Sequence, residues 1–152
     1  MKILFVCTAN ICRSALAEAI LRKKLQERGL ADIEVSSAGV SNYSGRLRDE
    51  TMSTLARWAG YEMGGFARYA SQDVVESADL VICMEHYHVV EIQKRLPYAR
   101  WNCIHLFNEI CFGEQTNLID PTGDTDDIYQ YVFDKIQSGC ETLSAKLATT
   151  IL

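Results

Sequence analysis

No hydrophobic run in the sequence approaches the roughly 20 residues that a membrane-spanning helix requires. The start of the chain, Met1 and Lys2 followed by ILFVC, is also too short for a signal peptide. The chain has only two prolines, no internal repeat, no low-complexity segment and no Pro/Gly/Ser-rich linker. We therefore expect one domain, spanning residues 1–152, in a cytoplasmic protein without membrane contact.

Positive charge is scarce as well. The 15 Lys and Arg residues are outnumbered by 20 Asp and Glu residues, and the resulting net charge of -5 disfavours nonspecific binding to nucleic acid or anionic lipid. We expect no nucleic-acid partner. A small cationic pocket stays compatible with this charge, because electrostatic fields are local.

Cysteine, in contrast, is abundant. The spacings of the six cysteines fit neither a disulfide framework nor the paired C-x-x-C motifs of zinc sites, so we expect no bound metal. We expect mostly buried thiols at Cys7, Cys12, Cys83, Cys103, Cys111 and Cys140. Cys7 needs a separate explanation, because it directly follows an apolar run and precedes a loop.

Apolar periodicity predicts strands that alternate with helices. The run KILFV (2–6) is typical of a central parallel strand that is buried on both faces. Further strands are predicted at 33–39, 78–84 and 101–107. Helices are predicted from Ser14 to Gly29, at 49–61, at 85–96 and from about Asp124 onward. This alternation implies an α/β fold with a central four-stranded parallel sheet and helices on both faces, three layers in all.

The predicted core faces of two helices follow from their 3–4 spacing. In the first helix the apolar positions are Leu16, Ala17, Ile20, Leu21 and Leu25. In the last helix they are Tyr129, Val132, Phe133, Ile136, Cys140, Leu143 and Leu147. We assign these residues to the core and give the aromatic ones no function.

The segment VCTANICRS (6–14) joins the first strand to the first helix, and in open α/β sheets ligands bind at this end of the strands. Successive backbone N–H groups in such a loop can form an anion nest, to which the helix N-terminus adds positive potential. Arg13 supplies a planar fork that can hold two oxygens of an oxyanion, and Asn10 tolerates the left-handed backbone of a tight nest. We therefore predict a phosphate cradle made by Thr8, Ala9, Asn10, Ile11, Cys12, Arg13 and Ser14.

Cys7 lies in the same field, which favours the thiolate, and thiolates attack phosphorus well. Ser14 could hydrogen-bond this thiolate. The pattern C-x5-R is weak by itself, and the strand-loop-helix context makes it specific. A phosphatase also needs an acid to protonate the leaving group, and Asp120 in NLIDPTGDTDD (117–127) is the best candidate. Asp-Pro also begins ordinary turns, and Asp124, Asp126 and Asp127 are typical helix-start charges.

These motifs together resemble the low-molecular-weight protein tyrosine phosphatase family. The resemblance covers almost the whole chain and rests on VCTANICRS, the SSAG near residue 37, the strand SADLVICM and the late DPTG. It implies an enzyme that removes phosphate from protein tyrosine without a cofactor, with Cys7 as nucleophile, Arg13 as phosphate clamp and Asp120 as general acid. It also implies phosphotyrosine proteins and inorganic phosphate or similar oxyanions as ligands of a monomer or weak dimer.

The resemblance implies other roles as well. Ser14 is implied beside the thiolate, and Asn10 and Ser37 are implied to brace the loop. Ile11 and Tyr43 are implied to flank the substrate ring, and Cys12 is implied to form a reversible disulfide with Cys7. The chain departs from the family pattern at Ala9 (usually Gly), Ala15 (usually Pro), Gly65 (often His) and Thr122 (usually aromatic).

Three other functions remain open. A protein-arginine phosphatase of the same family would tend to carry Thr where Ile11 stands. An arsenate reductase needs two further relay cysteines, and no partner follows Cys83. A non-catalytic phosphate- or flavin-binding module would need the loop but no Cys-Arg-Asp set.

Three kinds of polar residue have no assigned role. His86 and His88 lie two residues apart on a predicted helix and face different ways, so we expect surface or partly packed residues rather than a metal pair. His105 stands alone in a predicted strand and is assigned a structural role. Arg46 and Arg48, near Tyr43, either steer an anionic substrate or belong to a solvated loop.

Overall fold

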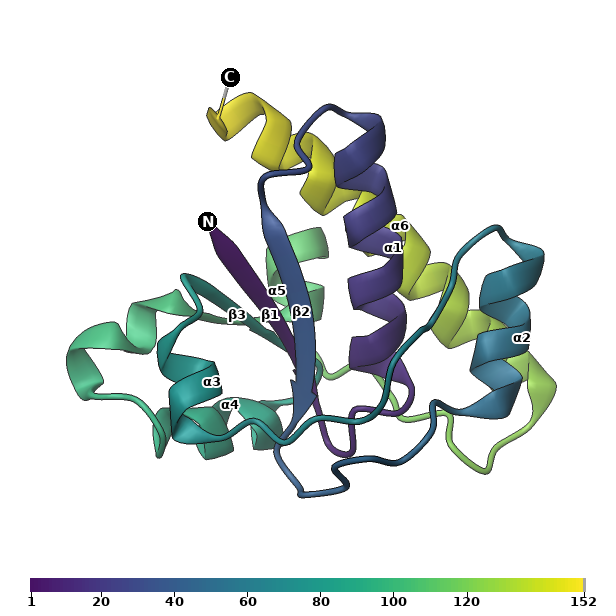
Figure 1. Ribbon diagram of the computed structural model, residues 1–152, viewed down its shortest axis with the longest axis horizontal. Helices are drawn as coiled ribbons and strands as arrows, with labels where there is room; N and C mark the ends of the chain where they lie inside the picture. Colours follow the sequence, from purple (N-terminus) through teal and green to yellow (C-terminus); the bar gives the residue numbers. More distant parts are fainter. Residues whose placement is uncertain (152) are drawn as a thin grey trace.

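Four parallel strands form the central sheet of the computed structural model, which describes residues 1–151 (Figure 1). The strands are β1 (Lys2–Cys7), β2 (Glu34–Gly39), β3 (Leu80–Cys83) and β4 (Ile104–Leu106). Their order in the sheet is β2-β1-β3-β4, so β1 has a hydrogen-bonded neighbour on each side. The predicted four-stranded parallel sheet is confirmed.

Helices cover both faces of this sheet. They are α1 (Arg13–Glu27), α2 (Glu50–Trp58), α3 (Gln72–Glu76), α4 (His86–Gln93), the 3-10 helix η1 (Tyr98–Cys103), α5 (Phe107–Phe112) and α6 (Asp126–Ile151). Ile3 and Phe5 of β1 belong to the core shared with α1, α5 and α6. Leu4 and Val6 point to the opposite core, which α3 and α4 cover. In Figure 1, α1, α2 and α6 lie to the right of the sheet, and α3 and α4 lie to the left.

The predicted helix faces are buried, and the errors concern short elements. All five predicted core residues of α1 and all seven of α6 are buried. The sequence pattern does not predict α3, η1 or α5. In η1 the Trp101 indole donates hydrogen bonds to the carbonyls of Gln93 and Leu96, both at 3.2 Å, so the chain coils there instead of extending. The predicted strand 101–107 therefore shortens to β4, and Phe107 begins α5.

The carboxyl ends of the strands meet the loops that precede α1, α2, α4 and α6, at the bottom of Figure 1. Gly39, at the end of β2, pairs with Cys7 across the sheet. A Cβ atom at Gly39 would lie 2.6 Å from the carbonyl oxygen of Thr8 and 2.8 Å from the carbonyl carbon of Ala9. Glycine is therefore required there, because the loop after β1 packs directly on this backbone. Within residues 1–151, no helix is long and apolar enough to cross a membrane.

Candidate active site

The loop between β1 and α1 is held in a tight curl. Asn10 adopts the left-handed conformation that the sequence predicts, with φ of 60°, and its side chain is fully buried. Its Oδ1 accepts hydrogen bonds from the backbone N–H of Arg68 at 2.9 Å and from Arg48 Nη1 at 3.0 Å. Arg48 also donates to the carbonyl of Asn10. The single residue with left-handed backbone in this loop is thus fixed from two other loops.

A chain of hydrogen bonds leads through Asn10 to the sulfur of Cys7. The amide nitrogen of Asn10 donates to Ser14 Oγ and Ser37 Oγ, both at 2.8 Å. Ser37 in turn donates to Glu18 Oε1 at 2.9 Å, and Ser14 Oγ lies 2.9 Å from Cys7 Sγ. Because Ser14 Oγ already accepts from Asn10, its own proton is directed at the sulfur when Cys7 is ionised. Such a donor stabilises a thiolate.

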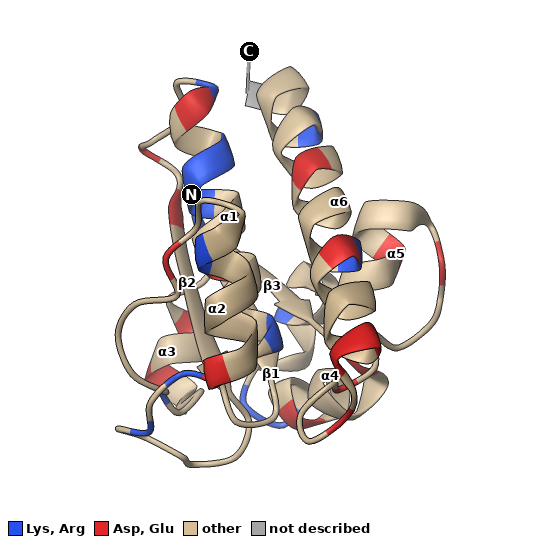
Figure 2. Cartoon of the chain, turned by 90° about the vertical axis from the view of Figure 1, so that its right-hand side faces the viewer, with Lys and Arg blue, Asp and Glu red and all other residues tan. Residues whose placement is uncertain are grey.

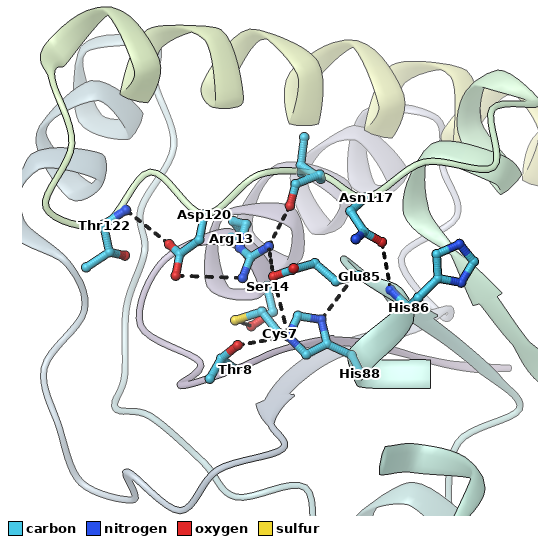
Figure 3. Close-up of polar contacts among 11 residues, drawn as sticks. Cys7, Thr8, Arg13, Ser14, Glu85, His86, His88, Asn117, Asp120 and Thr122 are labelled. Atoms are coloured by element: carbon cyan, nitrogen blue, oxygen red, sulfur yellow. Dashed lines mark hydrogen bonds and ion pairs between the residues drawn. The ribbon is translucent and has the colours of Figure 1, made fainter. Parts of the chain in front are cut away.

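Arg13 begins α1 with its guanidinium buried and paired (Figure 3). The side chain is 2% exposed. Nη1 donates to the carbonyl of Leu118 at 2.6 Å and lies 2.8 Å from Glu85 Oε2, while Nη2 lies 3.9 Å from Asp120 Oδ2. A buried charge must be paired and held in place, and two carboxylates and one carbonyl do this here. Within the described chain, the Nε and Nη2 nitrogens make no hydrogen bond, so this edge of the fork has only the 3.9 Å contact with Asp120.

A pocket of about 270 Å³ brings the predicted site residues together. Its walls are Cys7, Thr8, Ala9, Ile11, Cys12, Arg13, Tyr43, Arg46, Asp120 and Thr122. Asp120 is about half exposed, and its Oδ1 accepts the backbone N–H of Thr122 at 3.0 Å. The guanidinium of Arg46 lies over the ring of Tyr43, 4.8 Å from its centre. Three predicted site residues do not line this pocket but hold the loop through their mutual hydrogen bonds: Asn10, Ser14 and Ser37.

Arg48 answers one of the questions that the sequence leaves open. It does not belong to a solvated loop, because it binds the backbone and side chain of Asn10 and donates to the carbonyl of Gly64 at 3.1 Å. Its Nη2 would lie 3.7 Å from a Cβ atom on Gly65, the position where the family pattern often has histidine. Arg48, which lies next to Gly65, therefore binds Asn10 in a chain that has no histidine at position 65. Burial lowers the pKa of Arg48 from its usual value.

The expectation that His88 is a surface or partly packed residue is wrong. His88 is fully buried at the start of α4, whereas His86 is exposed. His88 Nδ1 accepts the backbone N–H of Glu85 at 3.0 Å, so in the neutral ring the proton is on Nε2, which lies 2.9 Å from Thr8 Oγ1. His88 therefore connects the segment after β3 to Thr8, the residue next to Cys7. Glu85 connects the same segment to Arg13 (Figure 3).

Glu85 and His88 are the site residues that the sequence analysis missed. Both follow β3, the strand that pairs with β1 in parallel, and Val6 is opposite Cys83 in this pairing. The rule that parallel strands end at one edge places residues 84–88 next to the loop after β1. Applied to EHYH, the rule predicts that both residues lie at the same edge of the sheet as Cys7, but not which residues they contact, because the contacts depend on the strand order.

We expect the buried His88 to make stability fall at acid pH. Burial, followed by the charge of Arg13, lowers the pKa of His88 to about 4. Between this value and about 6.5 the unfolded chain takes up a proton that the folded chain does not, so the free energy of unfolding decreases as pH falls through this range, by roughly 3 kcal/mol from this group. Urea unfolding followed from pH 7.5 to 4.5 measures this slope.

His88→Asn is the variant that isolates this effect, because an amide keeps an acceptor and a donor but does not titrate. We expect its stability to vary less with pH than that of the wild type over the same range. His86→Asn, which alters an exposed histidine two residues away, should retain the wild-type slope. Equal slopes for the wild type and His88→Asn would contradict the assignment.

Cys12 differs from Cys7 in its surroundings. Burial, followed by the charge of Asp49, raises the pKa of Cys12 well above its usual value. Cys12 therefore stays a neutral thiol at physiological pH. All six cysteines are free thiols and five of them are buried, as the sequence analysis predicts for most of them.

A four-stranded parallel sheet with helices on both faces is the fold that solved protein phosphatases share with this chain. The chain belongs to the low molecular weight phosphotyrosine protein phosphatase family, whose model matches residues 2–151. The resemblance stated from the sequence is thus confirmed.

Some relatives are named protein-arginine phosphatases and others protein-tyrosine phosphatases. The chain is 30% identical over 148 residues to a protein-arginine-phosphatase of Bacillus subtilis, covering 97% of each protein. It is 29% identical over 147 residues to the low molecular weight protein-tyrosine-phosphatase Etp of Escherichia coli K12, covering 96% of this chain and 94% of Etp.

Solved structures show the same fold. The YwlE arginine phosphatase, in a cysteine-to-serine mutant described as having a phosphorylated active-site serine, superposes with a TM-score of 0.90 at 27% identity, covering 97% of this chain and 95% of that one. A protein tyrosine phosphatase of Entamoeba histolytica gives a TM-score of 0.90 at 28% identity and covers 100% of this chain and 99% of its own.

Proposed function

We propose that the protein hydrolyses phosphate monoesters of protein tyrosine through a cysteinyl-phosphate intermediate. The observation that carries this proposal is the shared pocket of Cys7, Arg13 and Asp120, with a hydrogen-bond donor from Ser14 at the sulfur. In this proposal the amides of residues 8–14 and the free edge of Arg13 hold the phosphate oxygens. Donors that are already in place stabilise the charge of the transition state without having to reorganise.

The reaction proceeds in two displacements. The Cys7 thiolate attacks phosphorus, the bond from phosphorus to the tyrosine oxygen breaks, and Asp120 gives its proton to the departing phenolate. The Asp120 carboxylate then takes a proton from water, the water oxygen attacks phosphorus, and the bond between sulfur and phosphorus breaks. Inorganic phosphate leaves, and both the thiolate and the protonated Asp120 are regenerated.

The pocket walls favour an aromatic leaving group. Ile11 offers an apolar side chain and Tyr43 a ring at the mouth of the pocket, whereas a guanidinium phosphate would need polar partners there. Thr122 replaces the aromatic residue of the family pattern, and Arg46 also lines the pocket. Because relatives include enzymes of both names, phosphoarginine is the alternative substrate.

A peptide panel tests the proposed function. We expect the purified protein to release phosphate from p-nitrophenyl phosphate and from phosphotyrosine peptides in the presence of a chelator, with a higher kcat/KM on phosphotyrosine than on matched phosphoarginine peptides. Preference for phosphoarginine would make the alternative correct. A need for added metal would contradict the thiolate mechanism, and arsenate reduction coupled to thioredoxin would indicate the reductase instead.

Ile11→Thr adds a test of the pocket wall. Removing an apolar contact from one side of an aromatic substrate typically costs about tenfold or more in kcat/KM. We expect Ile11→Thr to lower kcat/KM on phosphotyrosine peptides by roughly that factor and to raise the ratio of phosphoarginine to phosphotyrosine turnover. Ile119→Thr, which changes an exposed isoleucine outside the lining of the pocket, is the matched control and should leave this ratio unchanged.

The proposed site includes a redox role for Cys12. Peroxide would oxidise the Cys7 thiolate to a sulfenic acid, and the Cys12 thiol would then condense with it to form a disulfide and release water. Both cysteines line the same pocket, and the raised pKa of Cys12 makes it the less readily oxidised of the two, so peroxide would oxidise Cys7 first.

A further inference from the structure

A second hollow, of about 530 Å³, lies between α2 and the first turn of α6. Its walls include Leu55 and Trp58 of α2, and three carboxylates lie around it, those of Glu50, Asp126 and Asp127. Trp58 is 80% exposed, an unusual state for a side chain with so much apolar surface. Figure 2 looks onto this face, with acidic residues at the N-terminal ends of both helices. We call this hollow the α2/α6 groove.

Asp49 connects the start of the α2/α6 groove to a wall of the active-site pocket. Asp49, the residue before α2, donates its backbone N–H to the carbonyl of Ile11 at 2.7 Å, and Ile11 is a wall of the pocket. Tyr129 of α6 donates its hydroxyl to Asp49 Oδ1 at 3.0 Å, which ties the two helices together at this point. A peptide whose phosphorylated side chain occupies the pocket would therefore leave it beside the groove.

The charges of the groove are not neutralised from within. Acidic residues in the first turn of a helix ordinarily complement the helix dipole, and this explains their presence. Within residues 1–151, however, none of the three groove carboxylates forms an ion pair, and no cation stacks on Trp58. A Lys or Arg side chain could satisfy both features, because its aliphatic stem packs on the indole while its charge faces the carboxylates.

We propose that the α2/α6 groove binds a cationic segment of the phosphoprotein substrate, adjacent to the phosphorylated residue. This inference rests on the proposed phosphatase function and assigns it a substrate class, phosphoproteins with Lys or Arg near the phosphorylated residue. A second copy of the chain is a poorer occupant, since a twofold contact would bring the acidic groove against itself.

The length of α2 sets the expected distance between the phosphorylated residue and the cation of the substrate. Its 9 residues extend for about 13 Å, the span of about four residues of extended peptide. The cation should therefore lie roughly four to six residues from the phosphorylated residue along the peptide.

Two phosphotyrosine peptides test this proposal, one with Lys and Arg at that spacing and one with Gln in their place. We expect the wild type to have a severalfold lower KM for the cationic peptide, with similar kcat, and this preference to weaken with added salt. Trp58→Ala and Asp126→Lys should each remove most of the preference, while turnover of the Gln peptide and of p-nitrophenyl phosphate stays at the wild-type level.

Matched controls exist elsewhere on the surface. Tyr98→Ala removes an aromatic side chain that is also 80% exposed, and Asp32→Lys reverses an exposed charge; both should keep the preference. Equal KM values for the two peptides in the wild type, or a preference that survives Trp58→Ala and Asp126→Lys, would contradict the binding of a cationic segment in the groove. Either result would leave the phosphatase function intact. A dimer in sedimentation that Trp58→Ala abolishes would overturn it in favour of a second copy. Loss of all hydrolysis in the wild type would refute the phosphatase function itself.

Discussion

Cys7→Ser is expected to abolish turnover of phosphotyrosine peptides and of p-nitrophenyl phosphate, with a loss of at least ~10⁴-fold in kcat. A serine hydroxyl stays protonated where a thiol ionises, so the donor from Ser14 at this position no longer has an anion to stabilise. The rest of the oxyanion site remains, because Arg13 is fixed by Glu85 and by the carbonyl of Leu118 rather than by the sulfur. Vanadate or phosphate should therefore still bind, as isothermal titration would show.

Two further variants make this result specific. Cys7→Ala removes every nucleophile at the position and should be equally inactive. Cys103→Ser changes a partly exposed cysteine outside the lining of the pocket and should retain wild-type kcat. Turnover of Cys7→Ala within tenfold of the wild type would exclude a covalent intermediate on Cys7.

The fold could be predicted because its long elements have unambiguous periodicity. The continuous apolar run of β1 and the 3–4 stripe of α6 each permit one interpretation, and the burial of both is observed. The short elements carry no such signal. In α5, Phe107 and Cys111 are buried one turn apart within six residues, a spacing that cannot be told from the end of a strand.

The components of the candidate site that lie within one continuous motif were also predictable. Cys7 and Arg13 share a single strand-loop-helix segment, and Asp120 is predicted because a phosphatase needs an acid and Asp120 lies in the late Asp-Pro motif. Three other residues contact the loop after β1 from segments that are distant in the sequence, namely Arg48, Glu85 and His88. These contacts depend on the strand order β2-β1-β3-β4. Periodicity predicts a parallel sheet but not this order, so their partners could not be assigned.

The support of Asn10 shows how a loop conformation can be held by residues other than those of the family pattern. The family pattern often has histidine where Gly65 stands. Without that side chain, the carbonyl oxygen and Oδ1 of Asn10 must accept hydrogen bonds from other donors. Arg48 and the backbone of Arg68 supply them. We infer that the constraint acts on the left-handed backbone of Asn10 rather than on the identity of the group that holds it.

Asp120→Asn should slow the hydrolysis of phosphotyrosine peptides by ~10²–10⁴-fold, the usual value of a positioned general acid. The size of the loss should depend on the leaving group. Tyrosine has a pKa of about 10 and leaves poorly as an anion, whereas p-nitrophenolate is a much weaker base and needs less protonation. We therefore expect a considerably smaller loss on p-nitrophenyl phosphate, measured as kcat/KM for both substrates with the same variant, because kcat/KM reports the step in which the phenolate leaves and not the later hydrolysis of the cysteinyl-phosphate.

The amide is a conservative replacement for this test. Asn at position 120 keeps an acceptor for the backbone N–H of Thr122, so the loop geometry should persist. Asp124→Asn, in the same loop, is the control: Asp124 accepts from Thr125 at 2.8 Å and does not line the pocket, and its variant should stay within about twofold of wild-type kcat. An equal loss in kcat/KM on both substrates would mean that Asp120 acts on the charge of the site rather than on the proton of the leaving group. The Asp120 carboxylate, 3.9 Å from Arg13 Nη2, would then serve to hold the clamp.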